Sequence, residues 1–153
     1  MTWLIVHGEH TLTQDVSAPP DDVRDFYVNL DNIKLVHPLI DSVHRLSRRE
    51  SSTGYEQSYR VVDRVPVGPF TLRVTYQARL HVCADGGVLT EADQWPGVRL
   101  RGIVSFDPIG TGTRVTERIR IFAPRVLAPV TTREAVKAHR TMLAGICRHF
   151  ASS

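Results

Sequence analysis

The sequence has few of the residues that form metal sites or disulfide frameworks. Cys83 and Cys147 are its only cysteines, and they stand far apart, without a C-x-x-C pair. It contains no H-E-x-x-H motif, no phosphate-binding loop and no dinucleotide fingerprint. We therefore expect two reduced thiols, no metal and no cofactor.

Long hydrophobic runs are also missing. No run of about 18 apolar residues occurs, so no transmembrane helix is expected. The segment from Met1 to Glu9 lacks a basic stretch followed by a sustained apolar stretch and a small-residue cleavage site. The sequence predicts a soluble cytoplasmic protein without stable membrane insertion.

Charge of one sign is not concentrated anywhere in the chain. Lys34 and Lys137 are the only lysines, the net charge is +3, and the arginines are scattered rather than forming a block. This pattern does not favour a nucleic-acid partner. The sequence also contains no G-x-S-x-G motif, and nothing beside either cysteine indicates an activated nucleophile.

What the sequence does have is the composition of an ordinary globular protein. Hydrophobic residues make up 42% and charged residues 23% of 153 residues. A chain of this length buries roughly 68–70% of its unfolded surface. We expect one domain spanning residues 1–153, built around one core.

The first half of the chain begins with a strand and a short helix. From Leu4 to Val16 apolar and polar residues alternate, which predicts a half-buried strand. Residues 17–22 carry two prolines and two acids suited to a first helical turn. Apolar residues at helical spacing follow up to Leu30, and the sequence allows one more turn before His37 and Pro38.

From Ile40 to Phe122 the pattern is that of strands separated by tight turns. Turn residues cluster at positions 51–54, 66–69, 85–87, 95–97 and 110–112. Such close spacing predicts an antiparallel meander. The clearest strand alternates one apolar face with one polar face; its apolar face carries Phe70, Leu72, Val74, Tyr76, Ala78, Leu80 and Val82.

A sheet with one apolar face needs a cover, and the last segment predicts one. Residues 131–134, Thr-Thr-Arg-Glu, fit a capping box that would begin a long terminal helix. Its apolar stripe contains Ala135, His139, Met142, Leu143, Ile146 and Phe150. The expected fold class is α+β, with a curved antiparallel sheet of about six to seven strands around this helix.

This order of elements resembles the START/Bet v 1-like superfamily, which includes polyketide cyclase/dehydrase-type and lipid-transfer proteins. The most specific local likeness is the alternating strand, then Ala18-Pro19, Val23 and Phe26, Asp31 and His37-Pro38; residues 112–116 resemble the last hairpin. Val36 departs from the tryptophan that many members carry before the His-Pro position. The resemblance implies a helix-grip fold with a cavity between sheet and terminal helix, which binds lipids, steroids or polyketide-like molecules and in some members acts on them.

Three polar residues fall in apolar phases of the predicted elements. They are Asp63, Glu117 and His139. Burial of an unpaired polar group costs a few kcal/mol, so each needs a partner, a water or a ligand. One interpretation is a polar anchor for a ligand, or an acid/base pair for catalysis. The other is a set of satisfied core residues, or of rim residues after a one-residue bulge.

Further candidates for ligand binding are large residues in the same phases: Tyr59, Tyr76, Trp95 and Met142. Amphipathic rings suit a pocket that is mostly apolar with a few hydrogen-bonding groups. The same residues can also serve as core without any ligand.

Three functions remain open from the sequence. The first is a carrier of a small hydrophobic molecule, and the second is a cyclase- or dehydratase-type enzyme that uses the cavity acids and bases. The third is a protein-interaction module that uses the outer sheet face, with a homodimer among the open oligomeric states.

Overall fold

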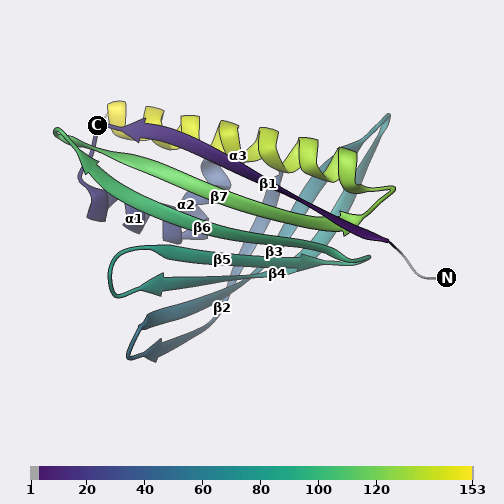
Figure 1. Cartoon of the computed structure of the whole chain (residues 1–153), viewed down its shortest axis with the longest axis horizontal. Coiled ribbons are helices and arrows are strands. Elements are labelled where there is room, and N and C mark those ends of the chain that lie inside the picture. Colours follow the sequence, from purple (N-terminus) through teal and green to yellow (C-terminus); the bar gives the residue numbers. More distant parts are fainter. Residues whose placement is uncertain (1–3, 153) are drawn as a thin grey trace.

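The computed structural model describes residues 4–152, which form one antiparallel sheet and three helices (Figure 1). The elements in chain order are β1 (Ile5–Val16), α1 (Pro20–Val28), α2 (Leu30–Val36), β2 (Ile40–Ser51), β3 (Gly54–Val67), β4 (Phe70–Cys83), β5 (Val88–Gln94), β6 (Val98–Ile109), β7 (Gly112–Pro124) and α3 (Ala128–Ala151). The predicted fold class is confirmed.

The sheet has seven strands in the order β1-β7-β6-β5-β4-β3-β2. Strands β2 to β7 follow one another as hairpins, which confirms the predicted meander. Strand β1 pairs instead with the last strand, from Ile5 opposite Pro124 to Val16 opposite Thr113. Helices α1 and α2 therefore carry the chain from one edge strand to the other.

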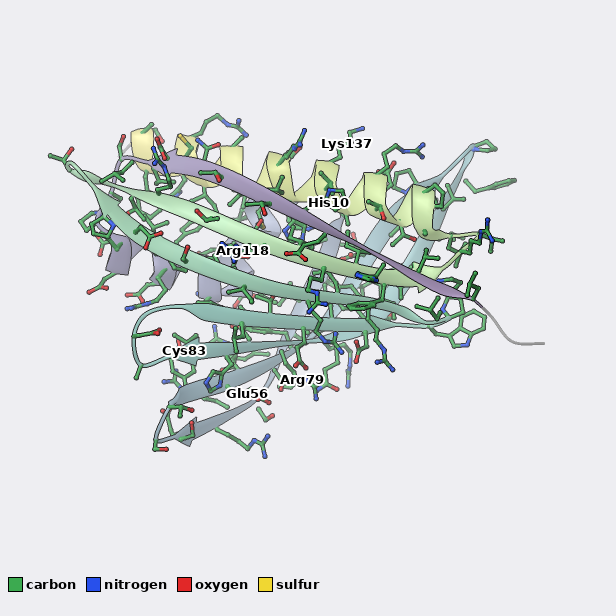
Figure 2. All side chains as sticks on the ribbon, viewed as in Figure 1. His10, Glu56, Arg79, Cys83, Arg118 and Lys137 are labelled. Carbon is green, nitrogen blue, oxygen red and sulfur yellow. The ribbon has the colours of Figure 1, made fainter. Side chains whose placement is uncertain are left out.

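Alternation of side chains gives the sheet one buried face and one exposed face. On β7, Val115, Ile119 and Ile121 are at most 2% exposed. The exposed face carries arginines, among them Arg79 and Arg118 (Figure 2). Several form ion pairs with carboxylates of adjacent strands, such as Arg79 with Glu91. These surface pairs explain the scattered positive charge as ordinary solvated surface.

The start of α3 differs from the prediction. The helix begins at Ala128, three residues before the expected capping box, and Leu127 occupies the N-cap position without a side-chain hydrogen bond. Pro129 lies in the first turn, where its missing N–H costs no hydrogen bond. The capping box at 131–134 was therefore wrong: the N–H of Thr131 already donates to the Leu127 carbonyl within the helix.

Helix α3 is long enough, at 24 residues or ~36 Å, to run the length of the sheet. It packs mainly against β1 and, to a lesser extent, β7 (Figure 1). Near its C-terminal end it approaches α2 so closely that a Cβ on Gly145 would lie 2.8 Å from the Cβ of Val36. Because α3 rests on one side of the curved sheet, space remains between it and β3 to β6.

None of the helices in the described part of the chain combines the length and apolarity that a bilayer-spanning segment needs.

Candidate functional site

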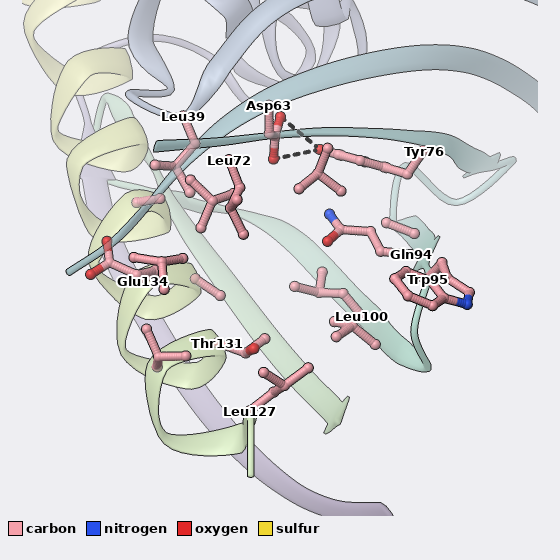
Figure 3. Close-up of a pocket in the computed structure, with 18 of the residues that line it drawn as sticks. Leu39, Asp63, Leu72, Tyr76, Gln94, Trp95, Leu100, Leu127, Thr131 and Glu134 are labelled. Atoms are coloured by element: carbon pink, nitrogen blue, oxygen red, sulfur yellow. Dashed lines mark hydrogen bonds between the residues drawn. The ribbon is translucent and has the colours of Figure 1, made fainter. Parts of the chain in front are cut away.

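A hollow of about 260 Å³ lies between α3 and the inner face of the sheet (Figure 3). Its wall is mainly apolar; among the side chains that line it are Leu39, Val65, Leu72, Val74, Ala92, Val98, Leu100, Leu127, Val130 and Ala138. A smaller hollow of about 90 Å³ adjoins it and is lined by Tyr27, Ile33, Val61 and Met142, among others. The two share His37, Tyr76 and His139, so the polar groups stand where they meet.

Glu117 and His139 form a largely buried polar pair. Glu117 on β7 is only 2% exposed, and His139 lies opposite it on α3. The Nδ1 atom of His139 is 3.1 Å from Oε1 of Glu117, and the Tyr27 hydroxyl donates a hydrogen bond to Oε2. Burial opposes a charge on His139, but the Glu117 carboxylate, helped by Asp63, outweighs this and raises the pKa of His139 above its ordinary value.

Asp63 and Tyr76 form a second pair, across β3 and β4. The Tyr76 hydroxyl lies 3.2 Å from each carboxylate oxygen of Asp63 (Figure 3). Burial raises the pKa of Asp63 to about 6, although the Tyr76 hydrogen bond and nearby His139 pull in the opposite direction. Asp63 therefore titrates close to neutral pH, which suits a group that exchanges a proton.

His37, in the loop after α2, completes the group. Its ring centroid lies 5.5 Å from that of His139. Burial and the positive field of His139 lower the pKa of His37 to about 3, so it is neutral at physiological pH. The backbone N–H of Leu39 donates to its Nδ1 atom at 3.3 Å. A neutral imidazole that accepts at Nδ1 carries its proton on Nε2, which makes that atom a donor.

The Nε2 atoms of His37 and His139 have no hydrogen-bond partner within residues 4–152. That part of the chain also contains no fully buried side-chain nitrogen or oxygen without a partner. Both Nε2 atoms are thus reachable from the hollows that the two rings line. When His139 is protonated, the site offers two N–H donors, one from each imidazole, beside the Asp63 carboxylate, a set that can bind a ligand carbonyl and a ligand hydroxyl.

The structure places most of the predicted site residues around these hollows. Asp63, Tyr76, Trp95 and His139 line the larger one, and Met142 lines the smaller one. Trp95 is 91% exposed, so only part of its ring borders the mouth.

Two predicted residues take other positions. Glu117 is not among the side chains that line either hollow; it lies behind His139 and holds that ring. Tyr59 is 2% exposed, as its inward phase predicts, but it borders a different hollow near Arg45 and donates its hydroxyl to the Val28 carbonyl.

Sequence reasoning missed two residues of the site. His37, beside Pro38, could border a pocket mouth but was interpreted as an ordinary loop histidine, and Tyr27 was interpreted only as an apolar position of a short helix. A buried Glu117 requires donors, which was a signal that a hydroxyl from another element had to reach it. Nothing in the sequence identified which hydroxyl.

In the described part of the chain, no group of three or more His, Cys, Asp and Glu side chains is placed to hold a metal ion. Cys83 and Cys147 are free thiols on different elements.

The meander and the terminal helix enclose a mainly apolar hollow that also carries polar groups. This arrangement agrees with the family that the sequence matches. Over residues 7–152 the match is to the family described as "Polyketide cyclase / dehydrase and lipid transport". The chain belongs to this family. No curated protein matches the sequence.

Solved structures with the same fold cover nearly the whole family domain. A START superfamily protein from Mycobacterium smegmatis has a TM-score of 0.73 at 13% identity, covering 96% of this chain and 99% of that one. The Zhui aromatase/cyclase from Streptomyces sp. R1128 gives 0.67 at 19% identity, covering 94% of each. A protein from Thermus thermophilus gives 0.70 at 18% identity, covering 97% of this chain and 98% of that one. At such identities the likeness shows the helix-grip fold alone.

Proposed function

We propose that this chain binds a small hydrophobic molecule that carries a carbonyl or hydroxyl group at one end. The observation that supports this proposal is the group of four hydrogen-bonding side chains, His37, Asp63, Tyr76 and His139, in the wall of a hollow that is mainly apolar. Ligand sites commonly combine an apolar wall with a few convergent polar groups.

The volume limits the size of the ligand. A cavity of about 150 Å³ holds benzene. The larger hollow has about 260 Å³, with the smaller one adjoining it. A molecule with two or three fused rings matches this space, with its apolar rings between α3 and the sheet and its oxygen against the imidazoles. Native mass spectrometry of the protein purified from its own host would detect such a molecule directly.

Filling the hollow should abolish binding. Ala135 lies on the part of α3 that lines the hollow, so Ala135→Phe places a ring in the space that the ligand needs. We expect the affinity for 2-acetylnaphthalene, measured by fluorescence titration, to fall at least about fivefold, because overpacking of a formed site costs about 1–3 kcal/mol. Ala151→Phe, at the exposed end of the same helix, is the matched control and should bind normally. Equal binding by both variants would contradict the proposal.

A second candidate is an enzyme of the cyclase or dehydratase type. It is favoured by one observation: a carboxylate with a pKa of about 6 lies in the same hollow as an imidazole whose pKa is raised. In a dehydration, Asp63 would take the proton from the carbon next to a ketone, and protonated His139 would give a proton to the leaving hydroxyl, which departs as water.

This candidate can be tested with a simple β-hydroxyketone, 4-hydroxy-4-phenylbutan-2-one, whose dehydration is followed by absorbance. For an enzyme we expect acceleration above buffer, and a loss of about 100-fold in His139→Gln. His44→Gln, on exposed β2 surface, is the control and should retain the full rate. If wild-type protein gives only the buffer rate, the enzyme candidate is contradicted for such substrates. The binding function proposed first would then remain.

A further inference from the structure

Most of the large apolar side chains that the structure exposes gather at one end of the molecule. They come from the start of β1, the β3–β4 turn, the β5–β6 turn and the connection from β7 to α3. We call this group the apolar rim; its members are Ile5, Val67, Phe70, Leu72, Trp95 and Val126. Trp95 is 91%, Val126 73% and Phe70 70% exposed.

Strand directions bring these segments together. In an antiparallel meander alternate turns lie at the same end of the sheet, so the β3–β4 and β5–β6 turns are neighbours. Ile5 pairs with Pro124, and its Cδ1 atom lies 3.6 Å from the Cβ position at Gly97 in the β5–β6 turn. Figure 1 shows both turns and the β7–α3 connection at the same end of the sheet.

The apolar rim surrounds the mouth of the hollow. Val67, Leu72 and Trp95 line the hollow on the sheet side, and Leu127 lines it on the helix side (Figure 3). Figure 3 places Trp95 at the outer edge of the hollow and Asp63 deeper inside. A contiguous exposed apolar group of this kind marks an interaction site more often than ordinary surface.

Positive charge flanks the same end. Arg99 and Arg125 are exposed, and neither forms an ion pair within 4.0 Å among residues 4–152, although Arg99 lies close enough to Asp93 to lower the pKa of that carboxyl. Arg64 and Arg73 share a single carboxylate, that of Asp41, at 3.4 and 3.2 Å. An exposed tryptophan among aliphatic side chains, flanked by arginines, is the composition of a surface that lies in the interface of an anionic bilayer.

We propose that the apolar rim docks reversibly onto membranes that contain anionic phospholipids, and so holds the mouth of the hollow against the bilayer. Charge favours an anionic membrane over a second copy of this chain as the partner that covers the rim. A two-fold dimer through the rim would bring Arg99 and Arg125 of each copy towards their own equivalents, which is unfavourable. An anionic lipid surface instead attracts each arginine and improves binding about fivefold per residue. The docking itself does not depend on the proposed function.

The test is binding to vesicles of phosphatidylcholine, with and without roughly 30 mol% phosphatidylglycerol, measured by co-sedimentation. We expect binding to the anionic vesicles at about 0.1 M salt, and much weaker binding at about 0.5 M salt because the shorter Debye length screens the arginines. In a Trp3→Phe background the fluorescence of Trp95 should shift to the blue when vesicles are added.

Matched variants distinguish binding through the apolar rim from non-specific hydrophobic adsorption to vesicles. The triple variant Phe70→Ser, Trp95→Ser, Val126→Ser should lose at least about tenfold in vesicle affinity, because each apolar side chain no longer leaves water. The triple variant Leu35→Ser, Leu89→Ser, Ile103→Ser changes three large apolar residues that are exposed elsewhere on the molecule and should bind within about twofold of wild type. Arg99→Gln and Arg125→Gln should each cost about fivefold, and Arg49→Gln, far from the rim, should cost little.

Three results would overturn the proposal. The first is absence of wild-type binding to anionic vesicles at low salt. The second is an equal loss in both triple variants while circular dichroism shows both to be folded. The third is a wild-type dimer in sedimentation velocity that the rim triple variant alone dissociates, since a second copy would then cover the rim.

Discussion

Replacing Glu117 with leucine is expected to destabilise the protein by about 3–5 kcal/mol, because it breaks a buried charged pair by removing one partner. The Tyr27 hydroxyl and the Nδ1 atom of His139 both lose their hydrogen-bond acceptor in a position that is 2% exposed. Glu117→Gln keeps an acceptor oxygen, so its cost should be smaller, about 1–2 kcal/mol. Urea unfolding followed by circular dichroism measures both.

Two further variants show whether this cost belongs to the pair. Glu56→Leu, which removes a more exposed carboxylate on the outer sheet face, should change stability by no more than about 0.5–1 kcal/mol. The double variant Glu117→Leu, His139→Leu should recover part of the loss, since an apolar pair leaves no buried charge. A Glu117→Leu protein within about 1 kcal/mol of wild type would show that the pair is not structural.

The same burial pattern explains how far the sequence could predict the site. Period-two alternation on β7 placed Glu117 inward, and the helical stripe placed His139 on the face of α3 that points to the sheet. Both predictions depend only on local periodicity, which tertiary contacts rarely reverse in long elements. The partner of Glu117 from α1, Tyr27, depends on how α1 packs under the sheet, and no local pattern encodes that.

Tyr59 illustrates a different limit. It shares the inward face of β3 with Asp63, so the sequence grouped the two as neighbours of one ligand. Four residues along a strand span about 13 Å. Asp63 therefore borders the hollow below α3, while Tyr59 lies near the C-terminal end of α1, where its hydroxyl reaches Val28. Phase assigns the face of a sheet, but position along the strand decides which site a side chain joins.

The edge strand β2 could not be predicted in detail either. Its pairing with β3 shifts register between Ile40 and Ser42 and again between Arg45 and Arg48. Such bulges add a residue on one strand and reverse the faces beyond it. The start of the terminal helix was also wrong, because residues 131–134 fit a capping box while the helix begins at Ala128, with Pro129 in its first turn.

Three titratable groups of the hollow, His37, Asp63 and His139, have pKa values that are shifted in different directions. His139 is favoured in its charged form by Glu117, and that charge is part of what holds neighbouring His37 neutral. Asp63, nearby, binds its proton more tightly than an exposed aspartate does. Asp63 is therefore a group through which the site changes its charge near pH 6, whereas His37 stays neutral there.

Between pH 6.5 and 4.5, His37 and Asp63 should change the stability of the protein in opposite directions. The pKa of His37 is about 3 in the folded protein and ordinarily about 6.5, so as the pH falls only the unfolded chain binds this proton. His37 therefore destabilises the protein by roughly 2 kcal/mol over this range. Asp63 has a pKa of about 6 when folded and ordinarily about 3.9. It binds its proton first in the folded protein, and so stabilises it by a similar amount.

The two contributions oppose each other, and variants should separate them. Relative to wild type, His37→Asn removes the destabilising contribution and should become more stable as the pH falls from 6.5 to 4.5. Asp63→Asn removes the stabilising one and should become less stable over the same range. Urea unfolding at several pH values gives both differences, and comparison with wild type cancels the other titrating groups. If stability changes with pH in the same way in both variants, neither pKa is shifted by burial in the hollow. Both shifts arise from the same loss of solvent, so both would then be absent.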